Sequence, residues 1–423
     1  MTPADDLSPR PDRPPADRWP GEVEGVAMFL AGAGGERLPA DRRASPWRLP
    51  PPLPAGRPCV LLDVAAASPE EVWVVGRTHG RPLAACWNGA SWTMPLAPPP
   101  AAALIGAGLE GVTVVRAVSG DGDPAPGMSR FAGEEGREAS PHPGGPAEVI
   151  AVGGAYDRLI GTEIPLIWQW DGAEWTQVPA PVLPDGSLSG RRGPAGEDRD
   201  TAEDYVLTDV ATVGSAEVWA VGHGFPARGG GPVALRRRDG RWRPVAGLPR
   251  VAQGKLLAVG GTSPQDVWAV GAADRTGLVV HYDGGSWRRM RVPVTRFPLT
   301  DVAAVAPDDV WCAGGDAVLR WNGRRWFRVE VPVASANTVT ALSATDVWVG
   351  GARGDLAHYD GHRWVCVAAP EDLHDTAVWC ASTAGRPHRG GMPTAVWMVG
   401  SRRLNRPRAA PRHCRFTSWS GKG

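Results

Sequence analysis

The sequence has little of several features that point to a function. Its 423 residues carry no net charge, with 45 basic and 45 acidic side chains, so no global field favours nucleic acid or an anionic membrane. Lysine is nearly absent, because Lys255 and Lys422 are the only two and the other basic residues are arginine. This usage, with abundant Ala, Gly and Pro, is typical of a GC-rich bacterial genome, so arginine clusters receive little functional weight.

Cysteine and long apolar runs are also scarce. The six cysteines contain no Cys-x-x-Cys pair, which argues against a zinc ribbon and a dense disulfide scaffold, while a single bridge between strands stays open. Residues 1–20 are rich in Pro and Asp and lack the apolar stretch of a signal peptide. No run reaches the roughly 18 apolar residues of a transmembrane helix. We therefore expect a soluble cytoplasmic protein.

Tryptophan, by contrast, is abundant, with 20 residues against four Tyr and six Phe. Most belong to a repeated motif: Asp/Glu-Val-Trp-x-x-Gly, a variable gap, then aromatic-Asp/Asn-Gly-x-x-Trp. A period of about 40–50 residues is typical of a propeller or a solenoid. Clear copies lie at 71–92, 266–287, 309–326 and 346–364, and a copy at 217–242 has Arg238 where the aromatic residue is expected.

Each repeat contains four short apolar runs separated by turn residues. In one unit they span 299–305, 310–314, 317–321 and 326–331, and their length and Val, Trp and Ala content predict strands, here lettered A to D. Pro and Asp predict a tight A–B turn, and Asp-Gly or Asn-Gly predicts the C–D hairpin. One four-stranded antiparallel blade cannot cover both its faces. We therefore predict an all-β β-propeller whose blades pack together through buried tryptophans.

The markers of strand B predict seven blades. They are Trp73, Ile150, Trp219, Trp268, Trp311, Trp348 and Trp397. A further segment, 26–32 followed by Trp47, either supplies strands that close the ring with the last blade or completes an eighth blade. We expect a single propeller domain at 25–421, a disordered N-terminal segment at 1–24, and a disordered insertion rich in Gly, Pro and acidic residues at 121–147.

With these motifs the chain resembles bacterial β-propeller repeat proteins built from DVWAVG…HYDGxxW units, over roughly residues 60 to 400. The likeness to Asp-box and kelch propellers is looser. In the Asp-box family the Asp-Gly-x-x-Trp half has a structural role at the turn between the third and fourth strands. The Ser-x-Asp that precedes it in that family is missing here, so the resemblance implies the propeller fold and does not extend to sialidase chemistry.

The two faces of the predicted ring differ in their connections. Because successive strands alternate in direction, the A–B and C–D turns share one face, here named the turn face, and the B–C and D–A loops share the other, the loop face. Function generally lies in variable loops held on a rigid scaffold. The loop face is therefore the candidate binding surface, with its variable connections at 77–85, 155–166, 181–204, 223–232 and 401–412.

Four aspartates are ligand-binding candidates. Asp63, Asp209 and Asp301 each lie ten residues before the Trp of strand B, and Asp375 is the expected match in the last unit. At the start of strand A these carboxylates face the mouth of the ring's central channel, where they could hold a divalent cation or a basic ligand group. In the alternative interpretation each carboxylate binds backbone N–H groups of a neighbouring strand or turn.

Histidines give a second set of candidates. His79 and His223 follow the closing glycine of strand B on the loop face, where they could act as ligand-binding or acid/base groups; in the alternative they are ordinary solvated loop residues. His281 and His358 precede the aromatic residue of strand C, a position that also holds Cys86 and other types. We interpret that position as a packing position.

The functional prediction follows from the neutral charge, the variable loops and the absence of GxSxG, HExxH and P-loop motifs. We predict a non-enzymatic monomer that needs no cofactor, binds another protein through its loop face, and binds neither nucleic acid nor membrane. The first alternative is a hydrolase or lyase acting on a glycan or small molecule at the channel mouth, where Asp63, Asp209 or Asp301 would have a perturbed pKa. The second is a lectin that stacks sugars on exposed tryptophans.

Overall fold

The structure is a computed structural model, and it describes most of the repeat region. The described residues are 23–31, 47–55, 59–79, 81–95, 104–115, 148–159, 162–183, 205–214, 217–224, 230–251, 253–273, 275–351, 354–369, 377–384 and 395–403. The segments predicted to be disordered, 1–24 and 121–147, lie outside this set except for Val23 and Glu24, which begin the first strand. The described residues contain no helix of the length and apolar character that crossing a membrane requires.

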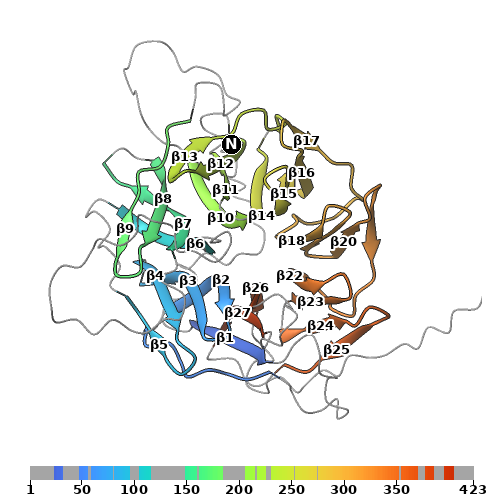
Figure 1. Cartoon of the computed structure of the whole chain (residues 1–423), viewed down its shortest axis with the longest axis horizontal. Coiled ribbons are helices and arrows are strands. Elements are labelled where there is room, and N and C mark those ends of the chain that lie inside the picture. Colours follow the sequence, from blue (N-terminus) through green and yellow to red (C-terminus); the bar gives the residue numbers. More distant parts are fainter. Residues whose placement is uncertain are drawn as a thin grey trace, which may run out of the picture.

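The described strands form seven sheets arranged around a common centre (Figure 1). Six sheets have four antiparallel strands in sequence order, and here they are numbered blades 1 to 6 along the chain. The innermost strands, the A strands of blades 1 to 6, are β2 (Cys59–Ser68), β6 (Leu104–Val115), β10 (Tyr205–Val213), β14 (Lys255–Ser263), β18 (Asp301–Ala306) and β22 (Ala336–Ser343).

The other strands of each blade follow outward from the centre. The B strands are β3 (Glu71–Thr78), β7 (Glu148–Asp157), β11 (Glu217–Gly224), β15 (Asp266–Ala273), β19 (Asp309–Gly314) and β23 (Asp346–Gly351). The C strands are β4 (Arg81–Trp87), β8 (Thr162–Trp170), β12 (Pro232–Arg238), β16 (Thr276–Tyr282), β20 (Ala317–Trp321) and β24 (Leu356–Tyr359). The D strands are β5 (Trp92–Thr93), β9 (Trp175–Gln177), β13 (Arg241–Pro244), β17 (Trp287–Arg289), β21 (Trp326–Val329) and β25 (Trp364–Val367).

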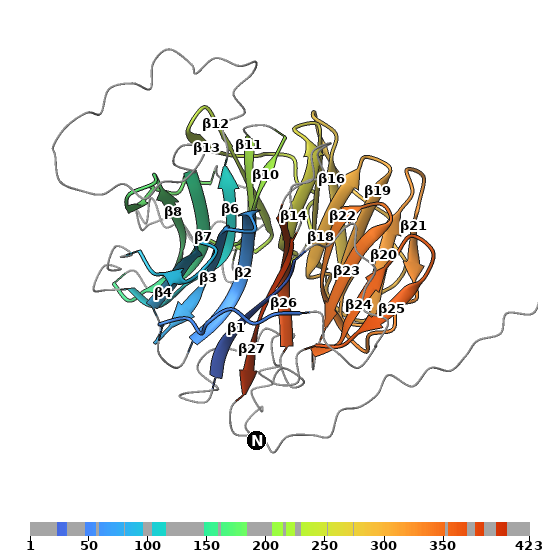
Figure 2. The ribbon, with the colours of Figure 1, turned by 60° about the horizontal axis from the view of Figure 1, so that its bottom comes forward.

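A three-stranded sheet closes the ring between blade 6 and blade 1. It joins the first and the last described strands, because β1 (Val23–Ala31) pairs with β27 (Ala395–Arg403), which in turn pairs with β26 (Ala377–Ala384). Figure 2 shows these strands side by side. A fourth position is reduced to one bridge, in which Phe29 and Arg48 exchange backbone hydrogen bonds of 3.0 and 2.8 Å. Of the two alternatives left open for the N-terminal segment, closure of the ring with the last unit is the one observed.

The predicted number of blades is wrong. The described residues form six four-stranded blades, and not seven or eight. The seventh marker, Trp397, lies in β27 of the closing sheet, where only three strands and the bridge at Arg48 are formed among the described residues. Counting motifs cannot reveal this, because the marker identifies strand B and says nothing of how many strands surround it.

Tryptophans fill the interfaces between blades, as predicted. At most interfaces the Trp of strand B in one blade contacts the last aromatic residue of strand C and the first Trp of strand D in the next. Trp268, for example, lies 5.6 Å from Trp321 and 5.5 Å from Trp326 between ring centroids. Trp73, Trp219, Trp311 and Trp397 make the same kind of contact.

One register assignment from the sequence is corrected by the hairpin of blade 3. We placed Arg238 at the aromatic position of strand C, but the residue opposite Trp242 is Arg237. Arg238 instead pairs with Arg241 and closes a two-residue turn in which Asp239 and Gly240 both have positive φ, at 52° and 74°. This conformation suits the right-handed twist of a hairpin and requires Asp-Gly or a similar pair.

Candidate functional site

The three described aspartate candidates share one structural position on the A strands. Asp63, Asp209 and Asp301 lie at the same register position, opposite Val75, Val221 and Ala313. Each carboxylate accepts the N–H of the following residue, all at 2.8 Å, through Oδ1.

The second oxygen of each carboxylate reaches the A strand of the next blade. Oδ2 of Asp63 accepts the N–H of Val112 at 2.7 Å, that of Asp209 accepts Val259 at 2.8 Å, and that of Asp301 accepts Val339 at 2.9 Å. The carboxylates therefore join blade 1 to 2, blade 3 to 4, and blade 5 to 6. We assign them this structural role, which was the alternative interpretation of the sequence.

Small residues occupy the same register position in the intervening blades, where Gly111, Ala258 and Thr338 lie. A Cβ added at Gly111 would lie 2.7 Å from the Cα of Asp209, so the close approach of the two strands requires glycine there. Burial, and then the charges of Asp63 and Asp301, raise the pKa of Asp209 well above its usual range. The charges of Asp63 and Asp301 thus disfavour ionisation of Asp209.

Of the other candidates, His79 and His223 do not join this group. Asp375 lies outside the described residues, and the pairing of β26 with β27 places Cys380, opposite Val399, at the equivalent register position. His79 is exposed at the end of β3 in blade 1, with its Nδ1 3.0 Å from Thr78 Oγ1, whereas His223 is half-buried in β11 of blade 3. Within the described residues, no three His, Cys, Asp or Glu side chains are arranged to hold a metal ion.

Exposed apolar side chains gather on the loop face instead. Among the described residues, every exposed large apolar side chain lies in or beside a B–C or D–A connection. Tyr156 and Leu159 flank the B–C connection of blade 2, and Leu159 is 84% exposed. The remainder lie in D–A connections: Leu49 before blade 1, Val182 after blade 2, and Val294 and Phe297 after blade 4.

The D–A loop of blade 4 presents its apolar residues on a well-bonded backbone. Val294 is 86% exposed, whereas its neighbour Thr295 is 1% exposed. The Thr295 hydroxyl accepts the N–H of Gly277 at 2.7 Å and donates to the carbonyl of Phe297 at 2.8 Å. Arg328 of blade 5 donates to the carbonyl of Val294 at 3.3 Å. The loop is therefore held from both sides while Val294 faces solvent.

A groove lies beside this loop. It has a volume of about 410 Å³ and is formed by the start of β16, the end of β17 and the first half of the D–A loop. Met290, Val292 and Val294 supply its apolar wall, and Arg289 and Arg291 supply its charge. A smaller groove of about 90 Å³ occupies the equivalent place in blade 5, where Asp316, Arg328 and Glu330 line it.

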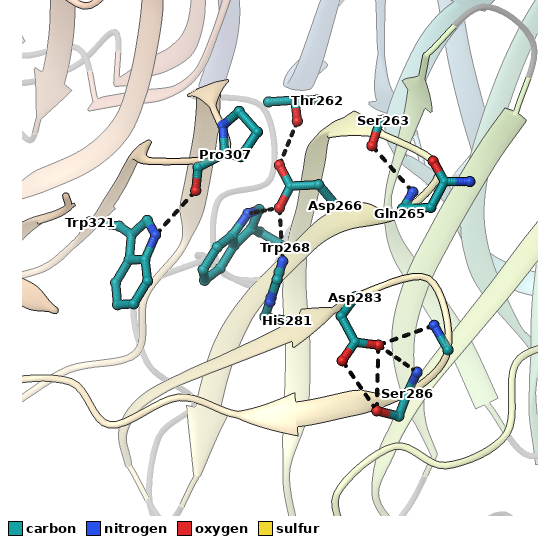
Figure 3. Close-up of polar contacts among 11 residues, drawn as sticks. Thr262, Ser263, Gln265, Asp266, Trp268, His281, Asp283, Ser286, Pro307 and Trp321 are labelled. Atoms are coloured by element: carbon teal, nitrogen blue, oxygen red, sulfur yellow. Dashed lines mark hydrogen bonds and ion pairs between the residues drawn. The ribbon is translucent and has the colours of Figure 1, made fainter. Parts of the chain in front are cut away.

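On the turn face, polar side chains form hydrogen bonds with other groups of the same blade. Asp266 Oδ1 accepts Trp268 Nε1 at 2.9 Å and lies 2.8 Å from His281 Nε2, while the His281 ring stacks on Trp268 at 4.0 Å (Figure 3). Asp346, Trp348 and His358 repeat this arrangement in blade 6. In blades 3 and 5 an arginine takes the place of the histidine. His281 and His358 are thus packing residues, as interpreted, with a hydrogen-bonded aspartate as well.

Sequence reasoning located the loop face but missed the residues that distinguish it. Leu159, Val182, Val294 and Phe297 were not singled out, because an isolated apolar residue in a loop has no periodicity to mark it. One signal was available at 287–293, where Trp-Arg-Arg-Met-Arg-Val-Pro follows the repeat. Its neighbour in blade 5, Trp-Phe-Arg-Val-Glu-Val-Pro at 326–332, has the same apolar spacing and a different charge.

Comparisons with known proteins give fold-level likeness. No protein-family model matches the sequence, and no curated protein shows significant similarity to it. Among solved structures it is similar to YCF48 bound to D1 peptide (14% identity, TM-score 0.48, covering 82% of this chain and 92% of that chain). It is also similar to YCF48 from Cyanidioschyzon merolae (14%, 0.46, 83% and 97%) and to the RRP9 WD40 repeats (10%, 0.48, 82% and 96%). No residue role is transferred from them at these values.

Proposed function

We propose that this propeller is a protein-binding module whose loop face contacts the partner. The observation that carries the proposal is that five of the six exposed large apolar side chains of the described chain lie in or beside connections of that face; they are Tyr156, Leu159, Val182, Val294 and Phe297. The sixth, Leu49, follows the bridge between Arg48 and Phe29 in the closing sheet. Exposed apolar side chains concentrated on one surface mark interaction sites. Six blades held by buried tryptophans supply the rigid support that positions such loops.

The turn face offers little to a partner by comparison. Outside blade 3, its C–D hairpins carry Asn or Asp side chains that accept backbone N–H groups of the same turn, as Asp283 does from Gly285 at 3.1 Å and from Ser286 at 2.8 Å. These backbone hydrogen bonds lower the pKa of Asp283. Groups already paired within a turn gain little from a partner, because binding only exchanges one hydrogen bond for another.

The two alternative functions lose the features on which they depended. The hydrolase or lyase hypothesis expected a perturbed pKa at Asp63, Asp209 or Asp301, and the pKa of Asp209 is raised. Its main support is weakened because all three carboxylates accept backbone N–H groups of the adjoining blade. The raised pKa of Asp209 is explained by burial and by the other two carboxylates. The lectin hypothesis required exposed tryptophans, and no described tryptophan is exposed.

The test is site-directed photo-cross-linking in extracts of the source cell. A photoreactive phenylalanine analogue replaces Leu159, Val182 or Val294 on the loop face, and Arg324 or His362 on the turn face serves as the matched exposed control. We expect the three loop-face positions to label the same protein and the two turn-face positions to leave it unlabelled. That protein, once purified, should bind the wild-type propeller in calorimetry. Labelling from the turn face alone, or from neither face, would contradict the proposal.

A further inference from the structure

We propose that the groove of blade 4 binds an acidic peptide segment that carries apolar anchor residues. This inference rests on the proposed function and names the chemistry of the partner. The site consists of the groove formed by β16, β17 and the D–A loop, together with Val294 at its rim. Three features carry the proposal: a preformed apolar wall, unpaired positive charge, and a difference from the equivalent groove in blade 5.

The apolar wall is preformed. Met290 and Val292 pack partly against the core between blades 4 and 5 and leave their remaining surface to the groove. The Met290 N–H donates to the carbonyl of Val279 at 2.9 Å, so the backbone continues the pairing of β16 with β17 beyond the end of the strand. Because the backbone is already held, little conformational entropy is lost when a ligand orders the site, and apolar contacts there convert efficiently into affinity.

The charge of the groove is positive and unpaired. Arg289 and Arg291 are both exposed, and in the described part of the chain neither forms an ion pair. Arg275 and Arg296, which adjoin groove residues in the sequence, are likewise exposed. Among the described residues, no carboxylate lines the groove. Unpaired cations around an apolar wall complement a segment that alternates Asp or Glu with apolar side chains.

Blade 5 gives an internal comparison. Trp287 corresponds to Trp326 in the repeat, so Arg289 matches Arg328 and Arg291 matches Glu330. Arg328 contacts Asp316 at 3.4 Å and donates to its carbonyl at 3.0 Å, so this arginine is neutralised within the protein. The two grooves share their apolar pattern and differ in charge. An arginine-rich composition alone does not explain that contrast, because it applies equally to both blades.

A peptide fits these features better than a nucleic acid. A phosphate backbone would use the arginines but would leave Met290, Val292 and Val294 without apolar contacts. Single-stranded nucleic acids also need aromatic platforms for their bases. None of the described residues that line the groove is aromatic. Phe297 lies just outside the groove and next to Gly315. A Cβ added at Gly315 would lie 2.5 Å from the Cβ of Phe297.

The test is selection from a phage-displayed library of random twelve-residue peptides on the full-length protein. We expect the selected peptides to be acidic and to contain aliphatic or aromatic residues. Synthetic copies should bind the double variant R289E/R291E at least about tenfold more weakly than the wild type in fluorescence anisotropy, and their affinity should fall with added salt. Val294→Ser should weaken binding as well.

Matched controls separate this inference from the proposed function. The variant R324E/R325E makes the same charge change at exposed positions of the turn face and should bind the peptides unchanged. If the selected peptides bound R289E/R291E as tightly as the wild type but bound Leu159→Ser more weakly, the groove would not be their binding site. The loop face would then remain the interaction surface. If an oligothymidylate bound as tightly as the peptides, and Val294→Ser did not weaken its binding, the proposal that the ligand is a peptide would be overturned. Failure to enrich any peptide also overturns this inference, while cross-linking decides the proposed function independently.

Discussion

Asp209 of blade 3 accepts the backbone N–H of Val259 in blade 4 at 2.8 Å, and so one side chain near the centre of the ring joins two neighbouring blades. The preceding residue reinforces the contact, because the Thr208 hydroxyl donates to the carbonyl of Leu256 in blade 4 at 2.8 Å. Thr300 and Asp301 repeat this pair of contacts between blades 5 and 6.

Asp209→Ala should lower the free energy of unfolding by about 2–4 kcal/mol. The substitution leaves the N–H groups of Val210 and Val259 without acceptors, and each unsatisfied buried donor costs about 1–3 kcal/mol. Urea denaturation measures the change. Asp308→Ala, at an exposed turn position, should have little effect. Equal stability of the two variants would show that the inter-blade contact contributes nothing.

The stability due to Asp209 should depend on pH in a defined direction. Its pKa is raised in the folded protein by burial and by Asp63 and Asp301, so the folded state holds this proton more tightly than the unfolded chain, where the Asp pKa is about 3.9. The contribution is therefore fully present below about pH 3.9 and falls as pH rises through the folded-state pKa. Over this range the free energy of unfolding of the wild type, measured by urea denaturation, should fall relative to that of Asp209→Asn, whose side chain does not titrate. A gap that stays constant with pH would contradict the assignment.

His281→Ala should destabilise blade 4 by about 1–3 kcal/mol, because Asp266 then loses a hydrogen-bond partner and Trp268 loses a stacked ring. Burial opposes ionisation of Asp266, but hydrogen bonds from His281 and Thr262 outweigh it and lower the pKa. The contribution of Asp266 is thus present above the unfolded pKa of about 3.9 and is lost as pH falls through the lower folded pKa. Thermal unfolding of this variant against the exposed control His362→Ala measures the first effect, and acid titration of the wild type measures the second.

Trp219→Ala should cost about 3–5 kcal/mol, the usual range for a buried aromatic residue reduced to alanine. Trp321 is half-buried, so its replacement by alanine should cost less. Chemical denaturation of the two variants makes the comparison. If both variants lost the same stability, the interfaces would not depend on the buried ring of strand B.

Thr295→Val should loosen the loop that carries Val294. The change keeps the side-chain shape but removes the acceptor for Gly277 N–H and the donor to Phe297 O. We expect faster amide hydrogen exchange at 290–299 and weaker binding of the selected acidic peptides, with exchange in blade 1 unchanged. Unaltered exchange in the loop would mean that Thr295 does not hold it.

The sequence was sufficient to predict the strands of a blade and the turns between them. Hydrophobic period, Asp-Gly dipeptides and the spacing of Trp268 and Trp287 are local signals, and they correctly gave strands, hairpins and buried rings in blade 4. The roles of Asp63, Asp209 and Asp301 were less accessible to prediction, since each depends on a backbone group 38–50 residues away that a strand of the next blade brings into range.

Two departures from the repeat show where tertiary structure decides. Ile150 replaces a tryptophan in blade 2, and Arg237 replaces an aromatic residue in blade 3. In the sequence the two replacements of aromatic residues show no relation to each other. In the ring they belong to one interface, where Arg237 is nearly buried and pairs with Glu148 at 2.5 Å. An ion pair there stands in for the aromatic contacts of the other interfaces.

The sequence by itself determined that four-stranded blades form and that they pack through tryptophan, because those properties follow from neighbouring residues. Only the tertiary structure decided that six complete blades and a closing sheet make the ring, and that the aspartates join blades. It also decided that Leu159, Val182 and Val294 share one exposed face. These properties depend on contacts and exposure between distant segments, which the repeat motif does not encode.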